Sequence, residues 1–248
     1  MNYTIDNNSK QITFLDNRFY QTNEGGYVPS VTTIGDAYPK GPEYFVWLKK
    51  VGEDADTIRD EAGRRGSIVH ELTEKFDAGE EINLLSESGR IGFKLGEWAM
   101  FERYVDFRNR FTFDILLCEY NFINQKLGFA GTCDRVIEMD GKKVLIDIKT
   151  SNSIYPFYWL QLAAYRKLYE AEFGQKIDSV GILWLNAKTR TEGKKDAVQG
   201  IGWQLVMRDE KVVDNDWDLF CATHKLWLAE NSTVQPKKLQ YNLTYKLK

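Results

Sequence analysis

The sequence has little of several features that would place a protein in a special class. Only three of its 248 residues are cysteines, and Cys118, Cys133 and Cys221 are widely spaced and odd in number. This pattern favours a reducing cytoplasm and argues against a disulfide framework. No apolar run approaches a membrane span, and the first ten residues lack the apolar core of a signal peptide. We therefore expect a cytoplasmic protein that does not act at a membrane.

An excess of positive charge is also missing. The chain carries 33 Lys and Arg against 36 Asp and Glu, a net charge of −3. That balance argues against a general nucleic-acid coat protein, which usually has a basic footprint. It does not exclude a local basic groove, because a groove can be basic on an acidic protein and metal-binding carboxylates add negative charge of their own. The local basic candidates, each singly explained by a solvated surface, are Arg64, Arg65, Lys188, Arg190, Lys194, Lys195, Lys237, Lys238, Lys246 and Lys248.

No internal repeat, low-complexity tract or linker divides the chain, and 43% of its residues are hydrophobic. One domain with a sizeable core is therefore expected. We divide it into an N-terminal hairpin and loop (1–40), a helical region (41–114), a core (115–207), and a C-terminal helix and tail (208–248). The order of strand, hairpin, helix and strand, preceded by helices, predicts an α/β fold with a central mixed β-sheet flanked by helices.

Local patterns give the expected elements. Pro156 in a first turn and Gly174 just past the last apolar position bound a helix over 156–173. Alternating and apolar runs predict the strands, and spacings of three and four predict the other helices. The predicted hairpin is 11–22, the helices are 42–76, 91–110 and 216–228, and the other strands are 115–123, 143–150, 179–185 and 200–207.

The most informative stretch runs from Phe129 to Tyr165. Asp134 ends a first strand, and an Asp140-Gly141 hairpin leads into a second strand that contains Asp147 and Lys149. Side chains two apart in a strand share a face, so Asp147 and Lys149 point the same way. The hairpin can bring the Asp134 carboxylate beside them. Two carboxylates and an ammonium are thus expected at one edge of the sheet.

Such a cluster suits a divalent cation. Carboxylates held close together repel, and a hard ion such as Mg²⁺ typically takes one or two of them. The ion can activate a water and stabilise charge on a phosphoryl oxygen, with Lys149 beside the water. The alternative is a solvated hairpin with one surface ion pair. For an isolated D-x-K triplet this alternative is favoured, because the triplet is common by chance.

The triplet does not stand alone. Gly66-x-x-x-His70 lies upstream, Gly131-Thr132-x-Asp134-Arg135 precedes the triplet, and Gln161-x-x-x-Tyr165 follows it. In this order the motifs resemble those of the PD-(D/E)XK nuclease superfamily. They look most like the RecB-like exonuclease branch, with the mitochondrial genome maintenance exonuclease, the CRISPR adaptation nucleases and phage exonucleases. The resemblance covers about residues 27–185.

The resemblance implies a restriction-endonuclease-like core and a site for Mg²⁺ or Mn²⁺. The implied metal ligands are His70, Asp134, Asp147 and the carbonyl of Ile148, and the implied catalytic residues are Asp134, Asp147, Lys149 and Glu119. Without the resemblance, His70 would be interpreted as a structural or surface histidine. Glu119 interrupts the apolar run of a central strand, where a carboxylate costs energy unless it is paired or metal-bound. Its alternative role is a partner for Arg135 or Lys149.

Residues expected to contact substrate are Gln161, Tyr165, Arg64, Arg65, Ser30 and Thr150. Gln161 and Tyr165 lie four apart on one helical face, and in relatives the matching pair lies beside the active centre. A surface Gln and a buried Tyr are the alternative interpretation. Ser30 precedes the Val31-Thr32-Thr33-Ile34 segment. It and Thr32 could meet a substrate phosphate, but a helix cap is the favoured role for either.

The same resemblance implies a DNA exonuclease acting on ends or single strands, in replication, recombination or repair and of possible phage origin. Some relatives hold an iron–sulfur cluster, but the chain contains no C-x-x-C and we expect none. One competing hypothesis is a nucleic-acid-binding or assembly module whose catalytic centre has lapsed. The other is an enzyme of a different class that shares only the short motifs.

Overall fold

The computed structural model describes residues 4–6, 10–188, 191–192, 202–232, 234, 236 and 246. Six of the basic candidates lie outside these residues, as does the start of the strand expected over 200–207. They are Arg190, Lys194, Lys195, Lys237, Lys238 and Lys248.

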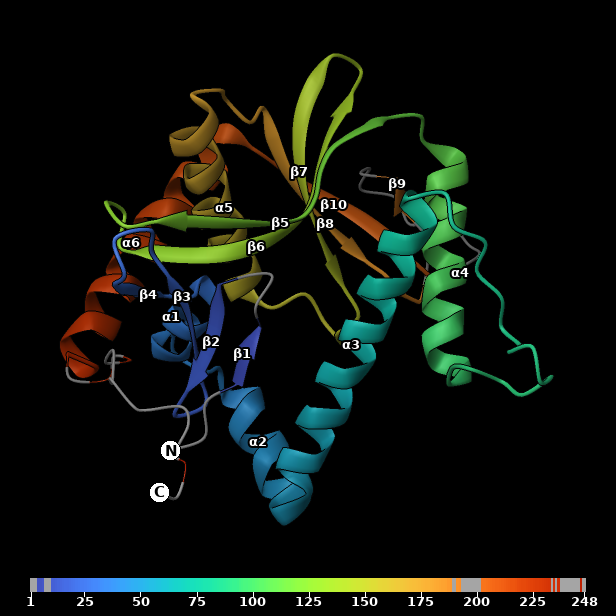
Figure 1. Cartoon of the computed structure of the whole chain (residues 1–248), viewed down its shortest axis with the longest axis horizontal. Helices are drawn as coiled ribbons and strands as arrows, with labels where there is room; N and C mark the ends of the chain where they lie inside the picture. Colours follow the sequence, from blue (N-terminus) through green and yellow to red (C-terminus); the bar gives the residue numbers. More distant parts are fainter. Residues whose placement is uncertain are drawn as a thin grey trace.

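A mixed β-sheet forms the centre of the molecule (Figure 1). Its order is β5 (Asp114–Asn124), β6 (Phe129–Met139), β7 (Lys142–Lys149), β8 (Ser179–Trp184), β10 (Gln204–Asp209) and β9 (Thr191–Glu192). Neighbours β5, β6 and β7 are antiparallel, β8 runs parallel to β7, and β10 is antiparallel to β8 and parallel to β9. The expected α/β class with a mixed central sheet is confirmed.

Helices cover both faces of this sheet (Figure 1). α5 (Pro156–Phe173) and α6 (Glu210–Glu230) lie on one face, and α3 (Ala55–Asp77) and α4 (Leu95–Arg110) lie on the other. The predicted helix over 42–76 is two helices, because Gly52 adopts a left-handed φ of 56° between α2 (Pro42–Val51) and α3, with a 3₁₀ turn over Gly52–Asp54. None of the helices in the described part of the chain is both long and apolar enough to cross a bilayer.

The two hairpins turn as their sequences require. Asp140 and Gly141 both have positive φ, 52° and 71°, which is the conformation of a two-residue hairpin between β6 and β7. Leu15 and Asp16, with φ of 48° and 62°, join β2 (Gln11–Phe14) to β3 (Asn17–Gln21). This turn lies one residue earlier than predicted from Asp16-Asn17.

The N-terminal hairpin is part of a larger unit than expected. With β1 (Thr4–Asp6) and β4 (Tyr27–Pro29) it forms a four-stranded antiparallel sheet, followed by the short helix α1 (Val31–Ile34) and a 3₁₀ turn over Gly35–Ala37. This sheet docks on β6: Ser30 bridges to Ala130, and the Tyr20 hydroxyl lies 3.0 Å from Thr132 Oγ1. These contacts place the N-terminal segment, up to about residue 34, beside strand β6 of the central sheet.

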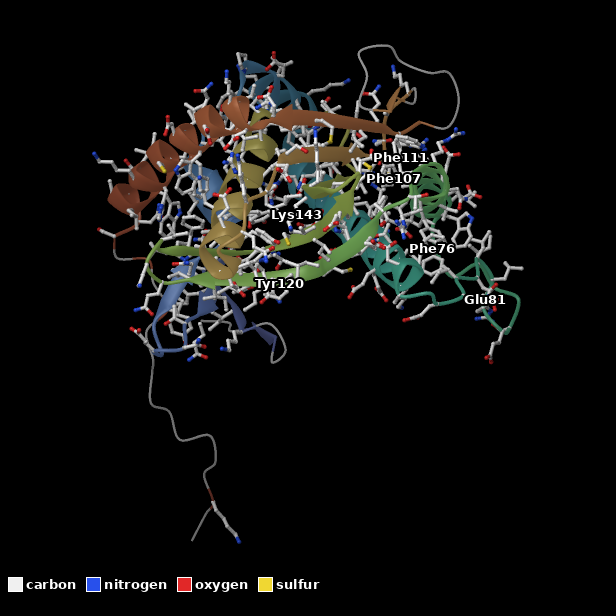
Figure 2. All side chains as sticks on the ribbon, turned by 90° about the horizontal axis from the view of Figure 1, so that it is seen from above. Phe76, Glu81, Phe107, Phe111, Tyr120 and Lys143 are labelled. Carbon is white, nitrogen blue, oxygen red and sulfur yellow. The ribbon has the colours of Figure 1, made fainter. Side chains whose placement is uncertain are left out.

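Apolar side chains fill both sides of the sheet. On the α3/α4 side, Phe107 packs edge-on against Trp203 with ring centroids 5.5 Å apart, and Ile146 and Ile148 of β7 are buried there. Figure 2 shows Phe107 and Phe111 where α4 meets the sheet, while Glu81 lies out on the α3–α4 loop. Because β7 is covered on both faces, Asp147 is buried as well, with only 1% of its surface exposed.

A buried ion network ties α3 to the sheet. Arg135 on β6 and Asp77 at the end of α3 are both almost fully buried, with Arg135 Nε donating to Asp77 Oδ2 over 2.8 Å. Arg108 Nε lies 3.0 Å from Asp77 Oδ1, and the Tyr104 hydroxyl also donates to Asp77. Removing one member of a buried pair leaves the other charge without compensation.

We therefore expect Asp77→Asn to destabilise the fold by about 3–5 kcal/mol, because the buried guanidinium of Arg135 would lose its closest carboxylate and Arg108 would lose the same partner. Urea denaturation followed by circular dichroism measures the change. Asp60→Asn, an exposed position on the same helix, is the matched control and should change the free energy of unfolding by less than about 0.5 kcal/mol. Equal stabilities for the two variants would contradict this account of α3 docking.

Candidate functional site

Three carboxylates meet where β5, β6 and β7 run side by side. The register pairs Cys118 with Arg135 and Tyr120 with Cys133, which puts Glu119 across from Asp134. On the other side Arg135 pairs with Ile146, so the next position along places Asp147 across from Asp134. The backbone pairing ends beside this level, where Asp134 Oδ2 accepts a 2.6 Å hydrogen bond from the Ile148 amide. Three neighbouring strands thus each bring one acid to the same level.

Glu119 has a strained backbone at this level. Its φ of 44° is left-handed, which a non-glycine residue adopts rarely and at an energetic cost. Its carboxylate Oε1 lies 3.2 Å from Arg135 Nη1 and 3.3 Å from His70 Nδ1. The pairing with Arg135 considered from the sequence is therefore present, and the same oxygen also faces the histidine.

His70 reaches the acids from α3. Its Nε2 lies 3.0 Å from the Ile148 carbonyl oxygen, and its Nδ1 lies 3.6 Å from Asp134 Oδ1. One ligand atom each of His70, Glu119 and Asp134 falls within 4.8 Å of the others. Gly66, one turn earlier, is not tightly packed, since a Cβ there would make an ordinary 3.5 Å contact with Thr150 Oγ1.

Lys149 is held on the opposite side of the acid row, toward α5. Its Nζ lies 2.7 Å from Asp147 Oδ2 and 3.0 Å from Gln161 Oε1, and it sits 4.5 Å from the centre of the Tyr158 ring. Gln161 Nε2 in turn donates to the Tyr165 hydroxyl over 2.8 Å. The predicted Gln and Tyr pair therefore orients the lysine, and Gln161 is buried rather than on the surface.

Gly131 of the predicted motif is explained by this packing. A Cβ at that position would lie 2.5 Å from Tyr165 Cε1. Because the ring lies directly on the β6 backbone, no other residue fits without moving Tyr165. The glycine of the motif thus sets the position of the Gln161–Tyr165 pair.

Charges in the site are strongly coupled. Burial would lower the pKa of His70, but Asp134 and Glu119 outweigh burial and raise the pKa to about 9. Burial raises the pKa of Asp134 to about 7. Repulsion from Asp147 and Glu119 adds to this rise, and the His70 charge opposes it. For Lys149, burial would lower the pKa, but Asp147 and Asp134 raise it. The site therefore holds protons that it would release to a bound cation.

The donor set fits a divalent metal ion. Asp147 Oδ2 is buried and accepts no hydrogen bond among the described residues, so its only compensation is the nearby lysine charge. Carboxylate oxygens, a carbonyl and one imidazole are the ligands of Mg²⁺ or Mn²⁺. His70 Nε2 contacts the Ile148 carbonyl, and this contact orients the ring so that Nδ1 faces the acids. Metal-bound histidines are commonly oriented in the same way by a partner at the nitrogen that does not bind the metal.

The surrounding cavity, of about 460 Å³, contains most of the predicted residues and several others. Ser30 lines it, although its Oγ also caps α1 by accepting from the Thr33 amide. Neither Thr150 nor the two arginines line it. Thr32 and Thr132, which belong to segments singled out from the sequence, also line it. The lining residues that the sequence did not indicate are Arg18, Tyr20, Ser67, Glu71 and Glu74. Glu74, one turn after His70, had a helical spacing that could have indicated it; Arg18 and Tyr20, on the N-terminal sheet, had no such signal.

The two predicted arginines lie outside this cavity for different reasons. Arg64 is engaged by Glu61 and by the buried Glu97, and so links α3 to α4. Arg65 Nη2 donates to the Thr150 carbonyl over 3.3 Å, at the end of β7. A substrate role for Arg64 would require breaking an ion pair, whereas Arg65 already stands at the edge where Lys149 ends its strand.

Metal binding should stabilise the protein, because the ion would neutralise a destabilised carboxylate cluster. At a hundredfold excess over the dissociation constant, Mg²⁺ or Mn²⁺ should add about 2.7 kcal/mol, seen as a rise in Tm by scanning calorimetry. Asp134→Asn should blunt this rise. An unchanged Tm of the wild-type protein at saturating metal would count heavily against the site.

The stabilisation should depend on pH. The folded pKa of His70, about 9, and that of Asp134, about 7, are both raised, so the folded protein holds more protons than the unfolded chain. Metal-free stability should therefore fall as pH rises through about 7 and then about 9. The increment from metal should grow over the same window, because metal binding releases these protons. Calorimetry in chelator and in metal tests this, with His70→Gln as the variant in which the upper step disappears.

Comparison with known proteins gives one family and several distant structures. A family model described as the PD-(D/E)XK nuclease superfamily matches residues 44–235. A solved structure of LHK-Exo in complex with dAMP matches at 15% identity and a TM-score of 0.38, covering 83% of this chain and 88% of that one. An alkaline exonuclease, LHK-Exo, from Laribacter hongkongensis matches at 14% and 0.35, covering 82% and 89%. No curated protein gives a significant match.

Proposed function

The chain belongs to the PD-(D/E)XK nuclease superfamily, and from this premise we propose that it is a metal-dependent nuclease that hydrolyses the phosphodiester bonds of DNA. We further propose that it is an exonuclease of the RecB-like branch, working on ends or single strands. The observation that carries the proposal is the cluster of His70, Glu119 and Asp134, with Asp147 on the neighbouring strand holding Lys149 beside it.

Within this site each residue has a distinct task. Asp147 and Gln161 hold the Lys149 ammonium at one point of the cavity wall. From there Lys149 donates to the attacking water and stabilises the negative charge that develops on the phosphoryl oxygen. Arg135 compensates Glu119 from within the core, so that the acid row keeps its position when substrate phosphate approaches.

A divalent ion, Mg²⁺ or Mn²⁺, held by His70 Nδ1, Asp134 and Asp147, with Glu119 beside it, would supply an activated water and neutralise phosphate charge. The Ile148 carbonyl, expected as a further ligand, lies at the other ring nitrogen, Nε2, and from there would orient the imidazole. The chain's own residues prepare for this by keeping the oxygens close at the cost of their mutual repulsion. Ser30 and Tyr165, which line the same cavity, are proposed to contact the phosphate and sugar of the reacting nucleotide, and Thr150 and Arg65 the strand beyond it.

The test compares single-stranded, double-stranded and circular DNA, end-labelled where ends exist, in metal and in chelator. Wild-type protein should degrade linear DNA only with metal, and Lys149→Ala should lower kcat about 10²–10³-fold, the usual loss for one transition-state donor. Lys142→Ala, at the exposed opposite end of β7, is the control and should keep full activity. Resistance of circles would separate an exonuclease from an endonuclease.

The outcomes also separate the competing hypotheses. Metal-dependent binding without cleavage would overturn the enzyme and favour a lapsed binding module. Activity that is equal in wild type and Lys149→Ala would mean that the reaction does not use this site. A preference for RNA over DNA would keep the chemistry and change the substrate.

A further inference from the structure

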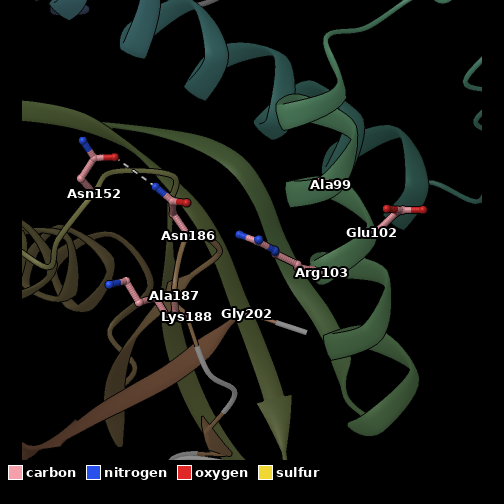
Figure 3. Close-up of a pocket in the computed structure, with 8 residues that line it drawn as sticks. All are labelled: Ala99, Glu102, Arg103, Asn152, Asn186, Ala187, Lys188 and Gly202. Carbon is pink, nitrogen blue, oxygen red and sulfur yellow. Dashed lines mark hydrogen bonds between the residues drawn. The ribbon is translucent and has the colours of Figure 1, made fainter. Parts of the chain in front are cut away.

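A second cavity, of about 830 Å³, opens on the α4 side of the central sheet (Figure 3). None of the residues that line it lines the cavity around Lys149. It lies between α4 and the segments that follow β7 and β8. The lining residues are Ala99, Glu102, Arg103, Asn152, Asn186, Ala187, Lys188 and Gly202.

This cavity shares a sheet edge with the candidate active site. β7 and β8 are parallel, and Lys149 pairs with Trp184 at their carboxyl ends. The Leu185 amide donates to the Lys149 carbonyl over 2.8 Å, so the segments that follow β7 and β8 lie side by side where they leave the sheet. Ligands of open α/β sheets commonly bind outside the carboxyl ends of such strands. Asn152, three residues after Lys149, already belongs to the cavity wall.

Arg103 gives the cavity its charge. Its half-buried Nη1 donates to the Leu185 carbonyl over 2.6 Å, and no carboxylate in the described part of the chain pairs with it. Burial lowers the pKa of this guanidinium, as expected for a cation without a counter-charge. Figure 3 shows Arg103 reaching toward Asn186, whereas Glu102 points to the other side of α4. A partly desolvated cation without an anion is a site that an anionic ligand would stabilise.

The neighbouring groups add donors around this guanidinium. Asn186 Nδ2 donates to Asn152 Oδ1 over 3.1 Å, which leaves the Asn152 amide hydrogens without a described partner. Lys188 is exposed at the rim. At Gly202 a Cβ would lie 1.8 Å from the Ala187 carbonyl oxygen and 3.5 Å from Arg103 Cζ. The Ala187 backbone therefore leaves no room for a side chain at 202, whereas the contact with Arg103 would be an ordinary one.

We propose that this cavity binds a backbone phosphate of the nucleic-acid strand beyond the bond that is cleaved, through Arg103, Lys188 and the amide of Asn152. The inference rests on the proposed function, because the strand is the substrate of the neighbouring site. Phosphates repeat along a nucleic-acid strand. If the substrate strand leaves the active site at the end of β7, its next phosphates come to this edge of the sheet. Arg65, bonded to the Thr150 carbonyl, stands at the same edge.

The test measures binding, so that it does not depend on catalysis. Fluorescence anisotropy follows single-stranded DNA oligonucleotides of increasing length on the Lys149→Ala protein in chelator, with Arg103→Gln, Asn152→Asp and Lys126→Gln added separately. Asn152→Asp keeps the Oδ1 acceptor for Asn186 and adds a negative charge, so it tests the cavity even if Arg103→Gln unfolds. Lys126 lies in the β5–β6 turn, on the other side of the molecule from α4 (Figure 1), and is the charge-loss control.

We expect Arg103→Gln and Asn152→Asp to raise the Kd of long oligonucleotides about tenfold or more, the usual loss for a charged hydrogen bond. The slope of log K against log salt should become shallower by about 0.7 for Arg103→Gln, the value for one phosphate of a single strand. The shortest oligonucleotides and the Lys126→Gln control should show neither change. A purely structural Arg103 would not alter the salt slope.

Unchanged binding of long oligonucleotides in Asn152→Asp and in folded Arg103→Gln would overturn the proposal. Two other results would overturn it too: an equal loss of affinity at every oligonucleotide length, or competition by a free mononucleotide that Arg103→Gln abolishes. In either case the ligand of the cavity would be a nucleotide and not the strand beyond the cleaved bond. The two proposals fail separately. If the wild type cleaves DNA but Arg103→Gln does not change binding, only the phosphate subsite is wrong. If binding depends on Arg103 but the wild type does not cleave, only the proposed nuclease activity is wrong.

Discussion

The arrangement depends on electrostatic crowding that the fold maintains. Glu119, Asp134 and Asp147 occupy one level of three adjacent strands, where their mutual repulsion and burial oppose ionisation. Cations placed from outside the row offset this cost: Arg135 from the core and His70 from α3. On the third side Lys149 is the counter-charge of Asp147. Folding free energy is thus spent on a preorganised anionic cluster, and a bound cation would recover part of it.

The supports of this cluster come from every layer of the molecule. Asp77 fixes Arg135 and so fixes the partner of Glu119. Gly131 lets the Tyr165 ring lie on β6, and through Gln161 the ring fixes the lysine. The N-terminal sheet adds Ser30, Arg18 and Tyr20 to the cavity wall. A change in any of these elements would move a charged group of the site, such as Arg135 or Lys149.

The parallel pair β7 and β8 organises the surface around the site. Their shared carboxyl edge carries Lys149 at its start and the Arg103 cavity beyond it. A protein with an overall negative charge can in this way carry cations such as Arg103 and Lys188 at one edge. The net charge of −3 therefore describes the whole surface and not this edge, because charge interactions are screened over about 10 Å.

The sequence by itself determined the strands β5 to β8, the hairpin between β6 and β7, and the helix α5. It did not determine the break between α2 and α3 or the four-stranded N-terminal sheet. Asp140-Gly141 needs left-handed backbone, and the alternation through Asp147 and Lys149 follows from strand geometry. Pro156 and Gly174 bound α5 because of their own backbone limits. Only the tertiary structure decided that Arg64 is tied to Glu97, that Gln161 faces Lys149, and that Arg18 and Arg103 stand beside cavities. These are contacts between segments far apart in the chain, and local spacing carries no information about which distant surface a side chain will meet.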